Sequence, residues 1–208
     1  MKKLLEDFKY LTYVILHPFD GFYEVRFRGK GNLALGAIIL ILYGLLGIIK
    51  YQYTGFIMNN NPQFAMNSIT TFIFGVFPYF LFCMSNWSVT AIFEGSGKFG
   101  DIFTVVTYAL FPKLVLDVAI VILSNVVTME ESAILTAISA FGTVYFAFLI
   151  FAGLCVAHEY TAATNVAMII ATFVAMIIII FLAILYITLI QRAISFGYTF
   201  AAEFMQRW

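Results

Sequence analysis

The chain has little charge of either sign, little histidine and almost no cysteine. Charged residues make up 11% of its 208 residues, against roughly a quarter in a soluble domain. Lys+Arg and Asp+Glu both number 11, so composition indicates no nucleic-acid partner. Cys83 and Cys155 lie in apolar runs without metal-ligand spacing. We expect two unpaired thiols, with one buried disulfide as the alternative, and neither a metal site nor a cofactor.

Apolar residues dominate instead, at 63% of the chain. They gather into five blocks, each long enough to cross a bilayer, which takes roughly 20 residues per helix. The blocks cover residues 33–53, 69–93, 102–125, 133–157 and 163–190. We therefore predict an all-α polytopic membrane helix bundle with five transmembrane helices. No linker or composition break divides the chain, so residues 1–208 are interpreted as one domain.

The two ends of the chain are expected at the membrane surface. Residues 1–32 should be cytosolic or interfacial, and residues 191–208 should form an interfacial tail that continues the last helix. Leu4, Phe8, Leu11 and Ile15 recur at helical spacing opposite charged residues. This pattern predicts an amphipathic helix in the interface, with a cytosolic helix docked on the bundle as the alternative. Residues 17–22, HPFDGF, are predicted to form a turn, because proline stops a helix and Asp-Gly favours a reversal.

Positive residues are unevenly divided between the two sides of the predicted bundle. With five spans, one side carries Lys2, Lys3, Lys9, Arg26, Arg28, Lys30 and Lys98, and the other carries Arg192 and Arg207. The positive-inside rule then places the N-terminus in the cytoplasm and the C-terminus outside. Lys50, near the end of the first block, is interpreted as a lysine that snorkels to the interface.

A lysine and an aspartate lie near the centre of the third block. Lys113 and Asp117 follow Pro112 directly and are spaced i, i+4, so both lie on one helix face and can pair. Charge at this depth is costly unless it is held or used. An internal ion pair that fixes the helix in the bundle is favoured, because a single pair makes a poor conduction path. A contact for a substrate, an ion or a partner is the alternative.

A glycine-rich polar loop, EGSGKFGD at residues 94–101, joins the second and third blocks. We interpret it as a tight reversal, with a partner epitope as the alternative, and expect Asp101 to be the N-cap of the next helix. His158 and Glu159, after the fourth block, are expected to be solvated interfacial residues. In the last block, Ala163, Ala167, Ala171 and Ala175 form a ladder of small residues. Such ladders let helices approach closely, within the chain or against a partner.

Motifs of membrane and soluble hydrolases are not met. In the loop at residues 94–97, Glu94 stands where a GxSG serine site needs its first glycine. Glu130 and Glu131 begin an EExxxR pattern, but Leu135 occupies the arginine position. Neither HExxH nor GxxxxGK[ST] occurs. The sequence therefore predicts a protein that is not an enzyme.

Several short motifs follow one another along the chain in a recognisable order. They are HPFDGF at 17–22, YQYTGF at 51–56, NWSVT at 86–90, EGSG at 94–97 and YALFP at 108–112. From residue 17 to about residue 190, this set resembles bacterial members of the Yip1 domain family. The residues that carry the central part are Asn86, Trp87, Glu94, Gly95, Gly97, Asp101, Tyr108 and Pro112.

The resemblance implies five spans with a cytosolic N-terminus. Eukaryotic relatives are membrane-trafficking scaffolds that bind Rab GTPases without catalysis, but this chain lacks their long N-terminal region and their DLYGP motif. Bacterial relatives are accessory proteins of the cytoplasmic membrane, often encoded beside carbohydrate ABC transporter components.

Our leading hypothesis is a lipid-embedded, non-enzymatic accessory or scaffold protein that binds other integral membrane proteins. Its more specific form is an auxiliary subunit that contacts the permease subunits of a carbohydrate ABC transporter. The alternative is a small transporter or channel that uses Lys113 and Asp117.

Overall fold

The computed structural model describes residues 2–59, 61–62 and 65–206, without the side chains of residues 2–7, 204 and 206. These residues form seven helices and no strand, which confirms the all-α prediction. The helices are α1 (Lys2–Leu16), α2 (Pro18–Phe27), α3 (Leu33–Tyr53), α4 (Ser68–Ile92), α5 (Phe99–Leu123), α6 (Ser132–His158) and α7 (Ala162–Gln206). Some of the predicted features lie outside this description. They are Leu4, the charged residues expected opposite it at positions 2, 3, 6 and 7, and Arg207.

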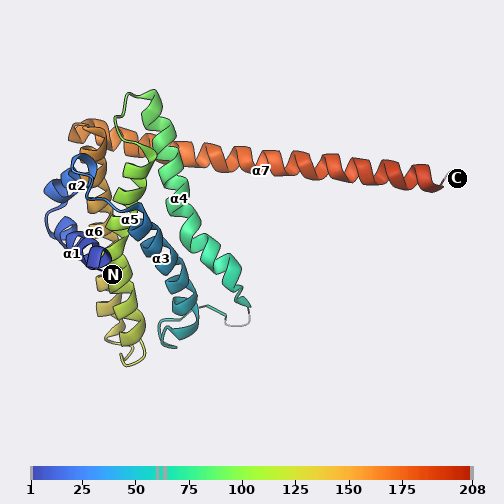
Figure 1. Ribbon diagram of the computed structural model, residues 1–208. Helices are drawn as coiled ribbons and strands as arrows, with labels where there is room; N and C mark the ends of the chain where they lie inside the picture. The colour runs from blue at the N-terminus through green and yellow to red at the C-terminus, as the bar shows by residue number, and fades with distance from the viewer. Residues whose placement is uncertain (1, 60, 63–64, 207–208) are drawn as a thin grey trace.

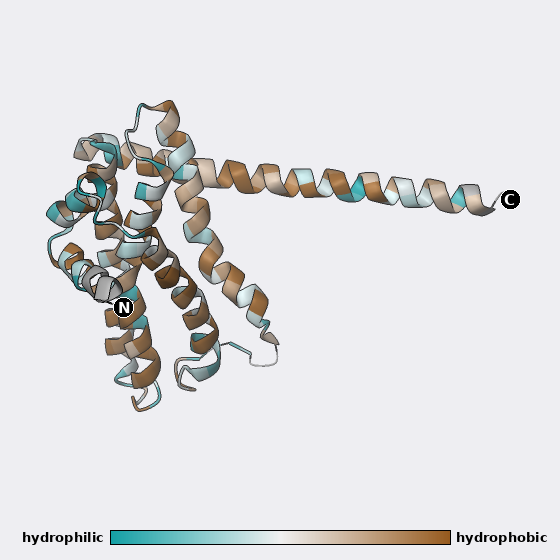
Figure 2. Ribbon diagram, in the orientation of Figure 1, coloured by the Kyte–Doolittle hydropathy of each residue, from teal (hydrophilic) through white to brown (hydrophobic). Residues whose placement is uncertain are grey.

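Helices α3 to α6 form a bundle whose long axes run in a similar direction (Figure 1). Together with α7 they make five helices long and apolar enough to cross a membrane, as predicted. Hydrophobic residues predominate in α3, α5 and α6, whereas hydrophilic residues occur at intervals along α7 (Figure 2). Asparagine caps start two of the five helices: Asn32 Oδ1 accepts from the N–H groups of α3, and Asn67 Oδ1 does so for α4. Helix α5 is central and buries seven consecutive residues, 104–110.

The predicted turn at residues 17–22 is wrong, because His17 is the N-cap of α2 and residues 18–22 form its first turns. Pro18 occupies the start of that helix, where its missing N–H costs nothing and its fixed φ suits the helix. Gly21 lets α1 and α2 cross closely, since a Cβ there would lie 2.6 Å from Val14 Cα. Leu11 and Phe22 are buried in the core. The amphipathic helix and its successor therefore form a hairpin packed on α5 and α6.

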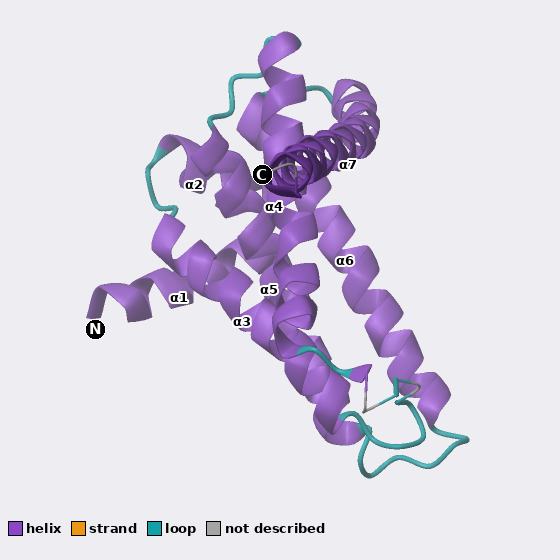
Figure 3. Cartoon of the chain, turned by 90° about the vertical axis from the view of Figure 1, so that its right-hand side faces the viewer, coloured by secondary structure: helices purple, strands orange, loops and turns teal. Residues whose placement is uncertain are grey.

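Helix α7 is a single helix of 45 residues. The segment predicted as a tail from residue 191 continues it without a break to Gln206. Its first turns pack on the bundle, where Asn165 and Thr172 are buried. From residue 180 to 201 every side chain is exposed. Figures 1 and 3 show this part leaving the bundle and running crosswise to the other spans.

Candidate functional site

The loop between α4 and α5 meets the end of α6 and the beginning of α7 at one end of the bundle (Figure 1). Glu94 and Glu159 both have a positive φ, at 56° and 58°. Few residues with a side chain adopt this left-handed conformation. Glu159 ends α6 in this way, so that the chain reverses within a few residues into α7. Glu94 itself is exposed.

A chain of buried and half-buried hydrogen bonds connects these segments. The N–H of Gly97 donates to His158 Nδ1 (3.3 Å), which leaves the ring proton on Nε2. That nitrogen donates to Asn86 Oδ1 (3.1 Å), and Asn86 Nδ2 donates to Thr172 Oγ1 (2.9 Å). Thr172 completes the chain by donating to the carbonyl of Met168 (2.7 Å). We call Asn86, Gly95, Gly97, His158 and Thr172 the loop hub.

The loop hub corrects the interpretation of His158 as a solvated residue. Its side chain is only 3% exposed, and that of Asn86 only 1%. Buried polar groups are costly unless they are hydrogen-bonded, and here each partner satisfies the next. The hub therefore holds α4, α6, α7 and the loop in one arrangement.

The two hub glycines are required by close packing. A Cβ on Gly95 would lie 2.7 Å from His158 Nδ1, Thr90 Cβ and Tyr160 Oη. A Cβ on Gly97 would lie 2.8 Å from His158 Cε1 and 3.0 Å from the carbonyl oxygen of Ala157. Neither position has room for a methyl group unless the histidine ring and its neighbours move.

We expect Gly97→Ala to lower the free energy of unfolding by about 1–3 kcal/mol, the usual effect of overpacking. Gly100→Ala is the matched control, because its Cβ would make only ordinary contact with Leu33, at 3.5 Å. Denaturant titration in mixed micelles measures both variants. Equal stability of the two would contradict the packing role of Gly97.

A second set of contacts ties α2 to the same loop. Arg26 forms an ion pair with Asp101 and donates to the carbonyl oxygen of Ser96. Asp101 also accepts from the N–H of Lys98 (3.0 Å). The expectation that Asp101 is the N-cap of α5 is therefore wrong: Lys98 is the N-cap, and Asp101 lies three residues later in the first turn. From there it still satisfies an otherwise free N–H.

An exposed ionic cluster lies at the end of α2. Glu24 pairs with Arg28 (2.8 Å) and Lys30 (2.5 Å). The hydrogen bond from Lys30 lowers the pKa of the Glu24 carboxyl below its usual range. Exposed pairs of this kind contribute little to stability, so we assign the cluster no role in holding the hub.

The other residues of the family motif lie near the loop hub or further along α5. Tyr108 is buried, and its hydroxyl accepts from the N–H of Asn32 (3.0 Å) at the start of α3. Trp87 is 44% exposed and packs edge-on against Phe99. Pro112 lies inside α5, beside Lys113. The structure thus gathers most of the motif at one end of the bundle, whereas Pro112 belongs to a different region.

That region is a charged cluster formed by Tyr43, Lys50, Lys113 and Asp117. The Asp117 side chain is 1% exposed, and its Oδ2 lies 3.6 Å from Lys113 Nζ and 3.3 Å from Lys50 Nζ. The hydroxyl of Tyr43 lies 3.5 Å from the same oxygen. Lys113 Nζ also donates to Thr143 Oγ1 (3.2 Å) on α6. The cluster joins α3, α5 and α6.

Sequence reasoning placed Lys113 and Asp117 together but missed Lys50. It interpreted Lys50 as a snorkelling side chain, whereas the structure turns its ammonium toward Asp117. Tyr43 precedes Lys50 by seven residues, which puts both on one face of α3. This spacing was the available signal. What it could not show is that this face meets α5.

The alanine ladder of α7 is only partly turned toward the bundle. Ala163 and Ala167 are exposed, and Ala171 and Ala175 are half-buried. Cys83 and Cys155 are free thiols, as expected. Among the residues that the structure describes, no group of three or more His, Cys, Asp or Glu side chains is arranged to hold a metal ion.

The family of the chain follows from a comparison with known domain models. The model of the Yip1 domain matches residues 12–185. The chain belongs to the Yip1 domain family. The matched region runs from the middle of α1 into α7 and includes both the loop hub and the charged cluster. No curated protein and no solved structure matches the chain. This Yip1 protein is a multi-pass integral membrane protein.

Proposed function

We propose that this Yip1 protein is a non-enzymatic accessory or scaffold protein that binds other integral membrane proteins through the outer part of α7. The observation that carries the proposal is the exposure of every side chain from residue 180 to 201. Membership of the Yip1 family, whose members take part in membrane trafficking and protein interactions, supports it.

The outer part of α7 is suited to helix–helix contact. Helix α7 contains the most apolar 18-residue stretch of the five membrane-length helices, and only 6% of that stretch is buried. Exposed apolar surface of this kind must be covered by lipid or protein. Exposed aromatic side chains occur along the outer part of α7 at Phe181, Tyr186, Phe196 and Tyr198. Large aromatic side chains often dominate the binding energy of interfaces. Because α7 runs crosswise to the bundle (Figure 3), it can reach a neighbour without disturbing the loop hub.

The finer proposal is an auxiliary subunit of a carbohydrate ABC transporter, in contact with its permease subunits in a bacterial cytoplasmic membrane. It rests on the resemblance to bacterial relatives. We further propose a cytoplasmic N-terminus; the outer C-terminus expected from five spans would require α7 to lie along the other spans, whereas it runs crosswise to them (Figure 3). The positive charges at the loop-hub end of the bundle, Arg26, Arg28, Lys30 and Lys98, support the cytoplasmic N-terminus.

The test is affinity purification in mild detergent from native membranes, followed by mass spectrometry. We expect the full chain to retain transporter subunits in stoichiometric amounts. Deletion of residues 181–208 should abolish their recovery, because it removes the exposed part of α7 and leaves its packed part in place.

A matched control replaces residues 181–206 with a leucine–alanine helix of the same length. This variant keeps an apolar helix but lacks the aromatic side chains, so it should also lose the partner. Full recovery with the control helix would show that α7 serves only as a membrane anchor. Isolation of the full chain without a partner would contradict the scaffold function itself.

A second candidate function, a small transporter or channel, is favoured by one observation. The buried Asp117 carboxylate is contacted by two ammonium groups and lies beside the cleft that contains Lys50. Ionisable residues inside a membrane often mark a transport path. Measuring solute or ion flux into vesicles that contain the wild type or Asp117 variants distinguishes this function from the scaffold function.

A further inference from the structure

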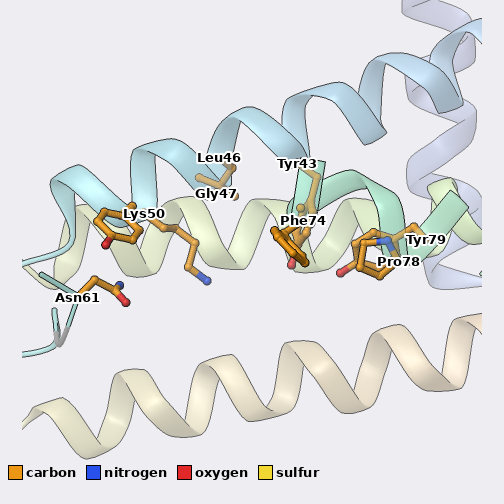
Figure 4. A pocket seen from close by; sticks show the side chains of 10 residues that line it. Tyr43, Leu46, Gly47, Lys50, Asn61, Phe74, Pro78 and Tyr79 are labelled. Carbon is orange, nitrogen blue, oxygen red and sulfur yellow. The ribbon is translucent and has the colours of Figure 1, made fainter. Parts of the chain in front are cut away.

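Two clefts adjoin on α4. The first, of about 340 Å³, lies between α3 and α4 and contains the Lys50 side chain (Figure 4). The second, of about 310 Å³, lies among α4, α5, α6 and α7. Pro78 and Tyr79 line both clefts, and we call the two together the α4 groove. Each has a volume within the range of roughly 300–1,000 Å³ that is typical of ligand sites.

The two clefts of the α4 groove differ in chemistry. Lys50, Tyr51 and Asn61 lie toward one end of the first cleft, where α3 approaches its last residue, Tyr53. Figure 4 shows Lys50 and Asn61 at this end, away from Pro78 and Tyr79. The second cleft continues with aliphatic and aromatic side chains: Phe82, Val106, Phe146, Ile150, Ile169 and Met176. A ligand that fills both clefts must therefore be polar at one end and apolar at the other.

The net charge at the polar end of the α4 groove determines the sign of the charge that a ligand must carry there. Lys50 and Lys113 share one carboxylate, Asp117, so the charged cluster has one positive charge in excess. The Lys50 side chain is 40% exposed, and within the described residues Asp117 is the one ion-pair partner of its ammonium. An ammonium group has three donors, so Lys50 can hold a second anion at the same time. Helix α3 ends three residues later, about 5 Å along its axis, which places Lys50 close to the membrane surface.

We propose that the α4 groove binds an anionic phospholipid, with the phosphate at Lys50 and an acyl chain running past Pro78 into the apolar cleft. The membrane around the protein supplies this ligand. A zwitterionic lipid is disfavoured because its own ammonium group would lie close to Lys50. This site is separate from the outer part of α7, so it does not depend on the scaffold function.

The experiment titrates purified protein in nanodiscs or detergent with phosphatidylglycerol and with phosphatidylcholine of the same acyl chains, and native mass spectrometry counts the bound lipids. We expect phosphatidylglycerol to bind about tenfold more tightly, because both phosphates can accept a hydrogen bond from Lys50 but only phosphatidylcholine brings a cation close to it. Lys50→Gln should abolish the difference, and Lys50→Arg should restore it. Lys9→Gln, which removes an exposed lysine on α1, should leave the difference unchanged.

A second variant tests the apolar cleft without changing any charge. Ala147 lines this cleft, and Ala147→Trp should weaken the binding of long-chain phosphatidylglycerol while six-carbon chains bind as before. Circular dichroism and gel filtration check that each variant is folded. The proposal is overturned if the wild type binds both lipids equally, or if Lys50→Gln keeps the preference. Displacement of the lipid by equimolar inorganic phosphate would also overturn it, because the ligand would then be a free anion.

Discussion

Asp117→Asn is expected to lower the free energy of unfolding by about 3 kcal/mol. Removal of one member of a buried ion pair costs about 3–5 kcal/mol, because the other charge is left without compensation. Lys113 is the charge left least compensated, because its side chain is only 13% exposed and so has little contact with water. Lys50, at 40% exposure, can turn toward water, and this places the effect at the lower end of the range.

Denaturant titration in mixed micelles measures this change, with Glu130→Gln as the control, because Glu130 is exposed in the loop before α6. Asp117→Asn also separates the two candidate functions. A scaffold predicts reduced stability and no flux in either wild-type or variant vesicles. A transporter predicts wild-type flux that disappears in a variant that is still folded. Unchanged stability of Asp117→Asn would contradict the structural role of the charged cluster.

Asn86→Leu is expected to lower the free energy of unfolding by about 2–3 kcal/mol. Leucine has a similar size, but it can neither accept from His158 Nε2 nor donate to Thr172 Oγ1. The ring N–H of His158 is then left buried without a partner, and an unsatisfied buried donor costs about 1–3 kcal/mol. Loss of the link to Thr172 should also loosen the attachment of α7 to α4.

A double-mutant cycle with His158→Leu isolates the interaction between Asn86 and His158. The double variant should be more stable than the sum of the two single changes predicts, because neither position then faces an unsatisfied polar group across the Asn86–His158 contact. The N–H of Gly97 loses its acceptor in both the His158→Leu and the double variant, so this loss cancels in the cycle. Ser88→Ala serves as a control on the same helix, since Ser88 is exposed and donates only to the carbonyl of Met84. Additive effects of Asn86→Leu and His158→Leu would show that the hydrogen-bond chain is not a unit.

The loop hub and the charged cluster stabilise different levels of the bundle, the hub at one end and the cluster nearer the middle. The hub joins α4, α6 and α7 through uncharged hydrogen bonds, and the cluster joins α3, α5 and α6 through an ion pair and its neighbours. In a bilayer, apolar burial gives little drive for helices to associate, so polar contacts and close packing decide their arrangement. Two polar sites of this kind therefore contribute, together with close packing, to how the spans pack.

The sequence by itself determined which segments cross the membrane. Apolar block length predicted α3 at residues 33–53, the bounds that the structure has, because hydrocarbon thickness and helix rise are local constraints. The i, i+4 spacing of Lys113 and Asp117 likewise made their pairing predictable, since both residues lie on one helix. The same local reasoning failed at residues 17–22, where Pro18 starts a helix instead of ending one.

Tertiary structure alone decided which side chains from different helices meet. His158 looks like a solvated residue until α4 places Asn86 beside it, and Lys50 looks like an interfacial lysine until α5 places Asp117 beside it. Helical periodicity shows which residues share a face, but not which neighbour that face contacts. The direction of α7 was likewise not predictable, because its residues 173–185 are all apolar and so carry no mark of the side on which the helix packs.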